Sequence, residues 1–204
     1  MTSLTPQLLA ALTLFAFVNS ITPGPNNTML MASGANFGFR ATVPHLCGVA
    51  IGFGVMVAAV GLGLGGLFIA FPGLHEILAI VGCLYMICLA WKIANAKGIA
   101  AGQAGGKPQT FWQAAAFQWV NPKAWAMAVG AITTYAPAEH YNLNVLLVAL
   151  VFLSVNAPSV AIWTGFGVAL RRFLDRPSVM KTFNITMAVL LLASLIPLAM
   201  EFAG

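Results

Sequence analysis

The residues with the clearest chemical potential are prolines and polar side chains that interrupt long apolar stretches at two points. The first interruption spans residues 22–27 (TPGPNN) and the second spans residues 120–123 (VNPK). Proline removes a backbone donor and disrupts the preceding helical turn, so each interruption frees polar backbone groups. A helix that restarts after such a break presents free amides and a positive dipole end, which suit a carboxylate. The alternative is a simple kink, which we favour for a lone proline but not for Pro-Gly-Pro followed by two asparagines.

Lys123 is the only charged residue well inside an apolar stretch. Placing a lysine there costs at least about 2.5–3.5 kcal/mol, so an intramembrane charge is a functional candidate by default. The alternative is that its long side chain reaches out to the membrane surface. Residues 156–159 (NAPS) form a third polar break at similar depth, which either lines the same site or is a locally satisfied kink. The predicted substrate-binding residues are Pro23, Gly24, Pro25, Asn26, Asn27, Asn121, Pro122, Lys123 and Asn156.

The elements that position these residues are long apolar segments. The chain has 204 residues, of which 60% are hydrophobic and 6% are charged, against about 25% charged in an ordinary soluble domain. A membrane span needs about 20 apolar residues, and segments this long and continuous favour helices over a β-barrel. We therefore predict an all-α integral membrane protein, with residues 1–204 forming a single transmembrane domain. The six predicted spans are 7–36, 42–71, 74–96, 111–136, 143–170 and 178–201.

The loops between these spans predict the orientation in the membrane. All Lys and Arg residues except Lys123 fall beside alternate loops, which would lie on one side: Arg40, Lys92, Lys97, Lys107, Arg171, Arg172, Arg176 and Lys181. Cytoplasmic loops carry such an excess, so we expect both termini outside. The net charge of +5 is then explained by membrane orientation and contact with membrane lipid, and no nucleic-acid partner is predicted.

A glycine-rich linker between the third and fourth predicted spans divides the spans into two groups of three. The first repeat is 1–97, the linker is 98–110, and the second repeat is 111–204. An odd number of spans makes the halves enter the membrane from opposite sides, which predicts a 3+3 inverted-topology repeat of six transmembrane helices. Each half opens with a broken helix, so helices 1 and 4 occupy corresponding positions.

Other residues carry weaker expectations. His45, His75 and His140 lie near predicted span ends, and we expect them to be solvated. Glycines four apart, at 34 and 38 and at 48 and 52, fit close helix packing and permit a homodimer. No cluster of acids, thiols or imidazoles is visible within the spans, so no metal site or cofactor is predicted.

The two interruptions also carry a family resemblance. The segment 22–26 followed by Gly34, the 38–40 segment (GFR) and Gly48, with residues 121–123 opening the second half, resembles the lysine exporter/RhtB family of bacterial amino-acid efflux proteins. Residues 90–94 (AWKIA), together with 107–108 and 111–112, look closest to the cysteine/O-acetylserine exporters. Homoserine, threonine and leucine exporters share much of the pattern.

This resemblance implies a proton-driven exporter in the bacterial inner membrane, with a small amino acid and protons as partners. Some relatives that export basic amino acids have membrane acids, and the predicted spans here show none, so a neutral zwitterion is expected. Its carboxylate would face the broken-helix amides or Lys123, and its ammonium would face the asparagine oxygens. The alternatives are a metal-ion or other small-solute exporter of the same superfamily, a membrane-embedded enzyme, and a non-transporting accessory protein. No enzyme activity is predicted.

Overall fold

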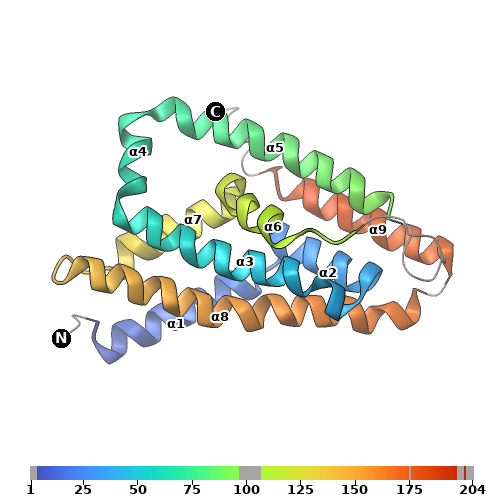
Figure 1. Cartoon of the computed structure of the whole chain (residues 1–204), viewed down its shortest axis with the longest axis horizontal. Coiled ribbons are helices and arrows are strands. Elements are labelled where there is room, and N and C mark those ends of the chain that lie inside the picture. The colour runs from blue at the N-terminus through green and yellow to red at the C-terminus, as the bar shows by residue number, and fades with distance from the viewer. Residues whose placement is uncertain (1–3, 97–106, 175, 197–199, 201–204) are drawn as a thin grey trace.

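The computed structural model describes residues 4–96, 107–174, 176–196 and 200, and those residues contain helices and connecting turns but no strand. Figure 1 shows the arrangement. In chain order the elements are α1 (Pro6–Ile21), α2 (Pro25–Phe37), α3 (Phe39–Ala59), the π-helical turn η1 (Val60–Leu64), α4 (Gly65–Ala70), α5 (Pro72–Ala94), α6 (Phe111–Phe117), the 3-10 turn η3 (Gln118–Val120), α7 (Pro122–Tyr135), α8 (Tyr141–Leu170), the 3-10 turn η4 (Arg171–Phe173) and α9 (Pro177–Ala193).

Prolines decide where many of these helices begin. The amides of the first helical turn have no acceptor within the helix, so a proline there loses no hydrogen bond. Its φ angle is also already helical. Threonines cap two of the starts: the Thr5 hydroxyl accepts from the Leu8 amide in α1, and Thr110 forms a reciprocal capping box with Gln113 at the start of α6. The helices that begin with proline at the first or second position are α1, α2, α5, α7 and α9.

The helices are apolar enough to cross a membrane, as predicted. Three segments qualify by length and hydropathy: Phe39–Leu64, Glu76–Ala94 and Tyr141–Phe173. The pair α1 and α2, bent by 54° at residues 22–24, makes a fourth if it is counted as one broken span. The protein is therefore an α-helical membrane protein. The arrangement of six spans as an inverted repeat stays a prediction.

Several predicted segments differ in detail from the observed helices. The second segment is interrupted at Gly63, where a φ of 128° produces the turn η1 before the short helix α4. The fourth segment divides into α6, η3 and α7, as expected of a broken helix. The predicted break at residues 156–159 is wrong, because α8 continues through Pro158. Asn156, two residues before this proline, is buried, whereas Pro158 itself is exposed.

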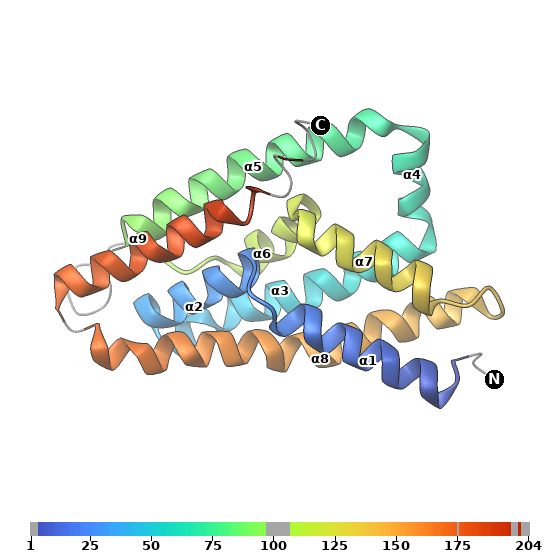
Figure 2. The same cartoon turned by 180° about the vertical axis from the view of Figure 1, so that it is seen from behind.

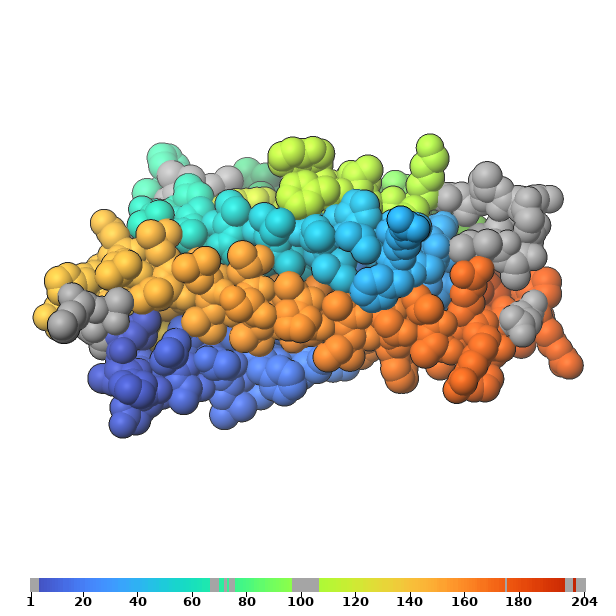
Figure 3. All heavy atoms as spheres, turned by 60° about the horizontal axis from the view of Figure 1, so that its bottom comes forward, coloured from blue at the N-terminus to red at the C-terminus, as the bar shows by residue number. Residues whose placement is uncertain are grey.

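The long helix α8 is central to the bundle, because α1, α2 and α3 all pack along it. Figure 3 shows α8 running between α1 and α3. Helices α5 and α9 pair with each other in a separate layer (Figures 1 and 2). The short helix α4 stands across the bundle and connects η1 to α5, while α6 and α7 lie between the two layers.

The fold gathers the basic segments at one end of its long axis. The α2–α3 turn, the C-terminal end of α5 and the α8–α9 turn all lie at the right-hand end of Figure 1. These segments carry Arg40, Lys92 and Arg171. The α7–α8 turn, which carries Glu139, lies at the opposite end. The bundle therefore separates charge along its length, as the loop pattern predicted.

Glycines allow two helix pairs to approach closely. A Cβ added at Gly34 of α2 would overlap the carbonyl oxygen of Thr164 in α8, and one at Gly167 of α8 would overlap the carbonyl oxygen of Met31. Gly48 and Gly52 of α3 face α6 in the same way, which confirms the packing predicted for that pair. Gly38 has a different role: its φ of 83° joins α2 to α3.

We expect Gly167→Ala to destabilise the protein by about 1–3 kcal/mol, because the added methyl group forces α8 away from the backbone of α2. The matched control is Gly165→Ala, on the same helix, where an added Cβ meets nothing within 4 Å. The measurement is thermal unfolding of the purified protein in detergent. Equal melting temperatures for the two variants would show that the α2–α8 crossing is not as tight as described.

Candidate functional site

The two breaks predicted from the sequence meet at one small cavity near the middle of the bundle. Its volume is about 30 Å³, which is on the scale of one or a few water molecules. It is lined by residues from α1, the starts of α2 and α7, and the facing sides of α3 and α8. The lining residues are Asn19, Ser20, Gly24, Pro25, Asn26, Asn27, Phe53, Asn121, Lys123, Ala124, Met127, Asn156 and Val160. We call this the central cavity.

Most of the predicted site residues lie around the central cavity, and two do not. Pro23 lies outside the lining set, although its carbonyl accepts from Lys123. Pro122 lines a separate, largely apolar pocket of about 670 Å³ between η1 and α7. The seven that line the cavity are Gly24, Pro25, Asn26, Asn27, Asn121, Lys123 and Asn156.

The local backbone explains why both breaks take the same form. A residue before proline is pushed out of the helical region. Thr22, before Pro23, has φ −64° and ψ 137°, and Asn121, before Pro122, has φ −92° and ψ 110°. Gly24, before Pro25, is fully extended. A new helix begins at Pro25 after the first break and at Pro122 after the second, and each has its amino end beside the cavity.

Lys123 connects the two breaks. Its Nζ donates to the carbonyl oxygen of Thr22 at 2.8 Å and to that of Pro23 at 3.4 Å. These carbonyls follow the C-terminal end of α1, where the helix dipole is negative. Gly24 makes room for this arrangement, because a Cβ there would lie 2.8 Å from Lys123 Cδ. The lysine is half-buried and crosses from α7 to the chain between α1 and α2.

The electrostatics of the central cavity favour an anion. Among the described residues that line it, Lys123 carries a positive charge and none carries a carboxylate. No side chain caps the start of α2, so its first-turn amides contribute further positive potential. The start of α7 is capped locally, because Asn121 Oδ1 accepts from the Lys123 amide at 3.1 Å. A small solute with a carboxylate matches this field.

Asn26 and Gln118 link the two halves of the chain through a reciprocal pair of amide hydrogen bonds. Asn26 Nδ2 donates to Gln118 Oε1 at 2.8 Å, and Gln118 Nε2 donates to Asn26 Oδ1 at 3.1 Å. Gln118 is fully buried and also donates to the Ala114 carbonyl. The sequence analysis missed Gln118. The sequence contained a signal for it, since a glutamine two residues before the second break, inside an apolar segment, is a polar group that needs a partner.

Asn27 holds the first break together from within. Its Nδ2 donates to the carbonyl oxygens of Ser20 and Thr22, both at 2.8 Å, and the residue is buried. Its carboxamide NH₂ group is therefore engaged by the end of α1, while a role in binding a substrate stays a prediction. Ser20 differs, because its buried hydroxyl lines the central cavity without a hydrogen-bond partner among the described residues.

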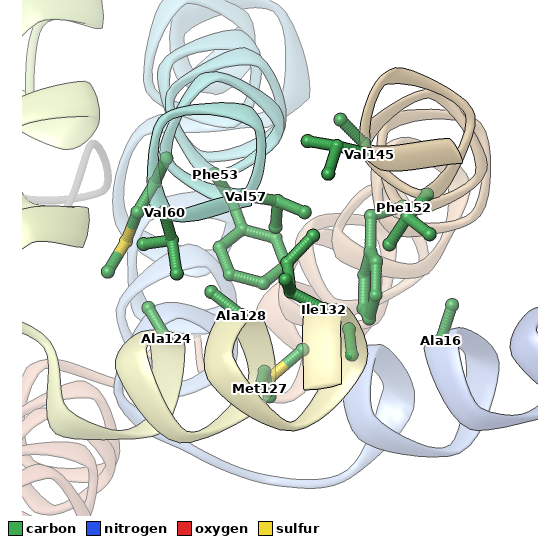
Figure 4. Close-up of a cluster of buried hydrophobic side chains, with 14 of the residues drawn as sticks. Ala16, Phe53, Val57, Val60, Ala124, Met127, Ala128, Ile132, Val145 and Phe152 are labelled. Atoms are coloured by element: carbon green, nitrogen blue, oxygen red, sulfur yellow. The ribbon is translucent and has the colours of Figure 1, made fainter. Parts of the chain in front are cut away.

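An apolar cluster forms the other wall of the central cavity. Phe53, Ala124 and Met127 line the cavity and also belong to the largest group of buried hydrophobic side chains. Phe53 packs edge-on against Phe152 with ring centroids 5.3 Å apart. Figure 4 shows side chains of α7 facing those of α3 and α8 in this cluster. The cavity is thus polar toward the two breaks and apolar toward the cluster.

The three histidines do not share one environment. The prediction for His45 is wrong: it is 2% exposed, and neither ring nitrogen has a hydrogen-bond partner among the described residues. His45 lies a turn and a half into α3, so the helix buries it against the neighbouring helices. His140 is exposed at the start of α8, as predicted. The side chain of His75 lies outside the described set.

The stretch of sequence that contains both breaks matches a known protein family. The family model for the LysE type translocator matches residues 17–201. The chain belongs to the LysE type translocator family. This confirms the resemblance drawn from the motifs around the two breaks, and both breaks of the translocator lie within the matched range.

Curated relatives of the translocator match over nearly its whole length. The cysteine/O-acetylserine efflux proteins of Salmonella typhimurium (strain LT2) and Escherichia coli (strain K12) are 30% identical over 190 residues, which is 92% of this chain and 95% of theirs. That of Escherichia coli O139:H28 is 30% identical over 191 residues, or 93% of this chain and 96% of its own. No solved structure gives a significant match.

We expect Asn27→Ala to lower the free energy of unfolding by about 1–3 kcal/mol, because the Ser20 carbonyl loses its side-chain donor and the Thr22 carbonyl keeps only Lys123. The matched control is Asn95→Ala. Asn95 is exposed and donates only to the carbonyl of Trp91 in its own helix. Unfolding of both variants would be followed by heat in detergent. If the two variants were equally stable, Asn27 would not be what holds the first break.

Proposed function

We propose that this translocator exports a small neutral amino acid, of the cysteine/O-acetylserine or homoserine/threonine type, in exchange for protons. The observation that carries the proposal is the convergence of Lys123 and the uncapped start of α2 on one cavity whose described lining has no acidic residue. The substrate carboxylate binds Lys123 or the amides of Asn26 and Asn27. In doing so it takes the place of the Thr22 carbonyl as the acceptor from Lys123 Nζ.

The charge balance of the central cavity supports a neutral zwitterion. One lysine matches one carboxylate, and the substrate ammonium can be bound by neutral oxygens of Asn121 and Asn156 and by backbone carbonyls. A basic amino acid would bring a second positive charge that no described lining residue neutralises. The printed names of the curated relatives point to cysteine and O-acetylserine, which are neutral amino acids.

Transport requires the central cavity to open, because about 30 Å³ is too small for an amino acid. We propose that the six helical segments form two inverted repeats, with α1–α2 and α6–α7 as the corresponding broken helices. Rocking of one repeat against the other would expose the cavity to each side in turn. The Asn26–Gln118 amide pair crosses from one repeat to the other, so it breaks and re-forms during the cycle.

The distribution of charge supports an orientation in the bacterial inner membrane. We propose that the end carrying Arg40, Lys92 and Arg171 faces the cytoplasm, as the excess of Lys and Arg indicates. Both termini would then lie outside. The substrate would enter from the basic end and leave from the opposite end.

We expect Lys123→Met to reduce counterflow of radiolabelled cysteine in proteoliposomes at least tenfold, because the carboxylate loses its charged partner. The matched control is Lys181→Met, since Lys181 is exposed near the start of α9 and remote from the central cavity. Lys123→Arg should retain part of the activity, because the charge is kept while the geometry changes. Counterflow in Lys123→Met equal to that in the wild type would contradict the proposed site.

Proton exchange is tested separately from substrate binding. We expect vesicles with an acidic interior to accumulate the amino acid as protons leave, and a protonophore to abolish this accumulation. The measurement is uptake with and without an imposed pH gradient, at equal membrane potential. Accumulation that does not depend on the gradient would overturn proton antiport while leaving the amino-acid assignment in place.

A further inference from the structure

A further pocket lies at the basic end of the bundle, apart from both the central cavity and the pocket that Pro122 lines. Its volume is about 570 Å³, within the range of small-molecule sites. It is formed by one side of α2, His45 of α3, the C-terminal half of α5 and the chain from Lys107 to Gln113. We call this the basic-end pocket. It is large enough for an amino acid, whereas the central cavity is not.

Two buried groups in the basic-end pocket have no hydrogen-bond partner among the described residues. They are both ring nitrogens of His45 and the Oε1 atom of Gln109. Several polar groups nearby are engaged: the hydroxyls of Ser33 and Thr42 pair at 2.9 Å, and Asn36 exchanges hydrogen bonds with Asn184. Buried polar groups in proteins are nearly always paired with protein, water or a ligand. His45 and Gln109 are therefore poised for a polar occupant of the pocket.

The unpaired groups indicate the chemistry of that occupant. Gln109 Oε1 only accepts, so it calls for a donor such as an ammonium group. A neutral imidazole can donate from one nitrogen and accept at the other, which suits a hydroxyl, thiol or carboxylate neighbour. Two exposed lysines, Lys92 and Lys107, line the same pocket, and no described lining residue is acidic. A small zwitterion with a carboxylate, an ammonium and a polar side chain satisfies all of these groups.

The basic-end pocket and the central cavity are lined by residues on one face of α2. Asn26, Met29, Ser33 and Asn36 are spaced three, four and three residues apart, which places them on a single stripe of the helix. Asn26 lines the central cavity, and the other three line the basic-end pocket. Asn26 and Ser33 are separated by about 10 Å along the helix axis. The Asn26–Gln118 amide pair lies at the cavity end of this stripe.

We propose that the basic-end pocket is a second binding site for the transported amino acid, occupied before the solute reaches the central cavity. His45 and Gln109 bind its polar groups, and Lys92 or Lys107 attracts its carboxylate at the rim. The inference rests on the proposed function, because it takes the exported amino acid as the ligand. Each chain then binds two molecules of substrate at saturation, one in each site.

The test is the stoichiometry of binding of radiolabelled L-cysteine, measured by equilibrium dialysis of the purified full chain with a phosphine reductant present. We expect two molecules per wild-type chain. His45→Phe replaces the imidazole with an apolar ring and should leave one bound molecule per chain. Gln109→Leu should also leave one. Gln109 precedes α6 rather than lying within a helix, so this variant serves as a second test if His45→Phe fails to fold. His140→Phe, at an exposed position, is the matched control and should still bind two.

The variants also separate the two sites from each other. Lys123→Met should leave one bound molecule, and combining it with His45→Phe should leave none. One molecule per wild-type chain that is lost in Lys123→Met and unaffected by His45→Phe would overturn the second site while supporting the central one. Two molecules in folded His45→Phe and Gln109→Leu would likewise overturn it. No binding of L-cysteine, O-acetylserine, homoserine or threonine to the folded wild-type chain would overturn the second site and the amino-acid assignment together.

Discussion

The structure depends on one constraint: a membrane-spanning chain that breaks its helices must satisfy the freed backbone groups within the protein, because lipid cannot. Here two helices are broken near the middle of the bundle, and several of the freed groups are paired with residues close by, whereas no side chain caps the start of α2. Asn27 donates to carbonyls at the end of α1, Lys123 reaches across to the Thr22 carbonyl, and Asn121 caps the start of α7. The lysine belongs to the second half of the chain and the carbonyl to the first. The same hydrogen bond therefore stabilises a break and joins the two halves.

The surrounding helices are arranged so that this polar centre can exist. The glycines of α2, α3 and α8 let backbones approach closely, which brings α2 against α8 and α3 against α6. The phenylalanines of α3 and α8 and the alanines of α7 fill the space on the opposite side of the cavity. A polar cavity walled on one side by a dense apolar cluster keeps Lys123 in a medium where an anion is bound more strongly than in water. In the function proposed above, binding and release of a carboxylate would be coupled to the contacts between the two halves.

Much of this could be predicted from the sequence. The two proline-rich breaks, the buried lysine and the one-sided distribution of basic loops are local signals, and the structure places seven of the nine predicted residues around one cavity. Prediction failed where the outcome depended on distant contacts. Helix α8 continues through Pro158, and Asn156 and Ser159 beside it are buried against the neighbouring helices. The partnership of Gln118 with Asn26 joins residues 92 positions apart, and the burial of His45 follows from the packing of α3 against its neighbours, so neither could be read from spacing along the chain.

A structure of the protein with the exported amino acid bound would test the central claim most directly. The account predicts a solute between the starts of α2 and α7, with its carboxylate within hydrogen-bond distance of Lys123 Nζ and with the bond from that nitrogen to the Thr22 carbonyl lost. The central cavity would be enlarged and the Asn26–Gln118 pair separated. A substrate carboxylate found away from both half-helix starts, with Lys123 still donating to Thr22 and the central cavity unchanged, would contradict the account.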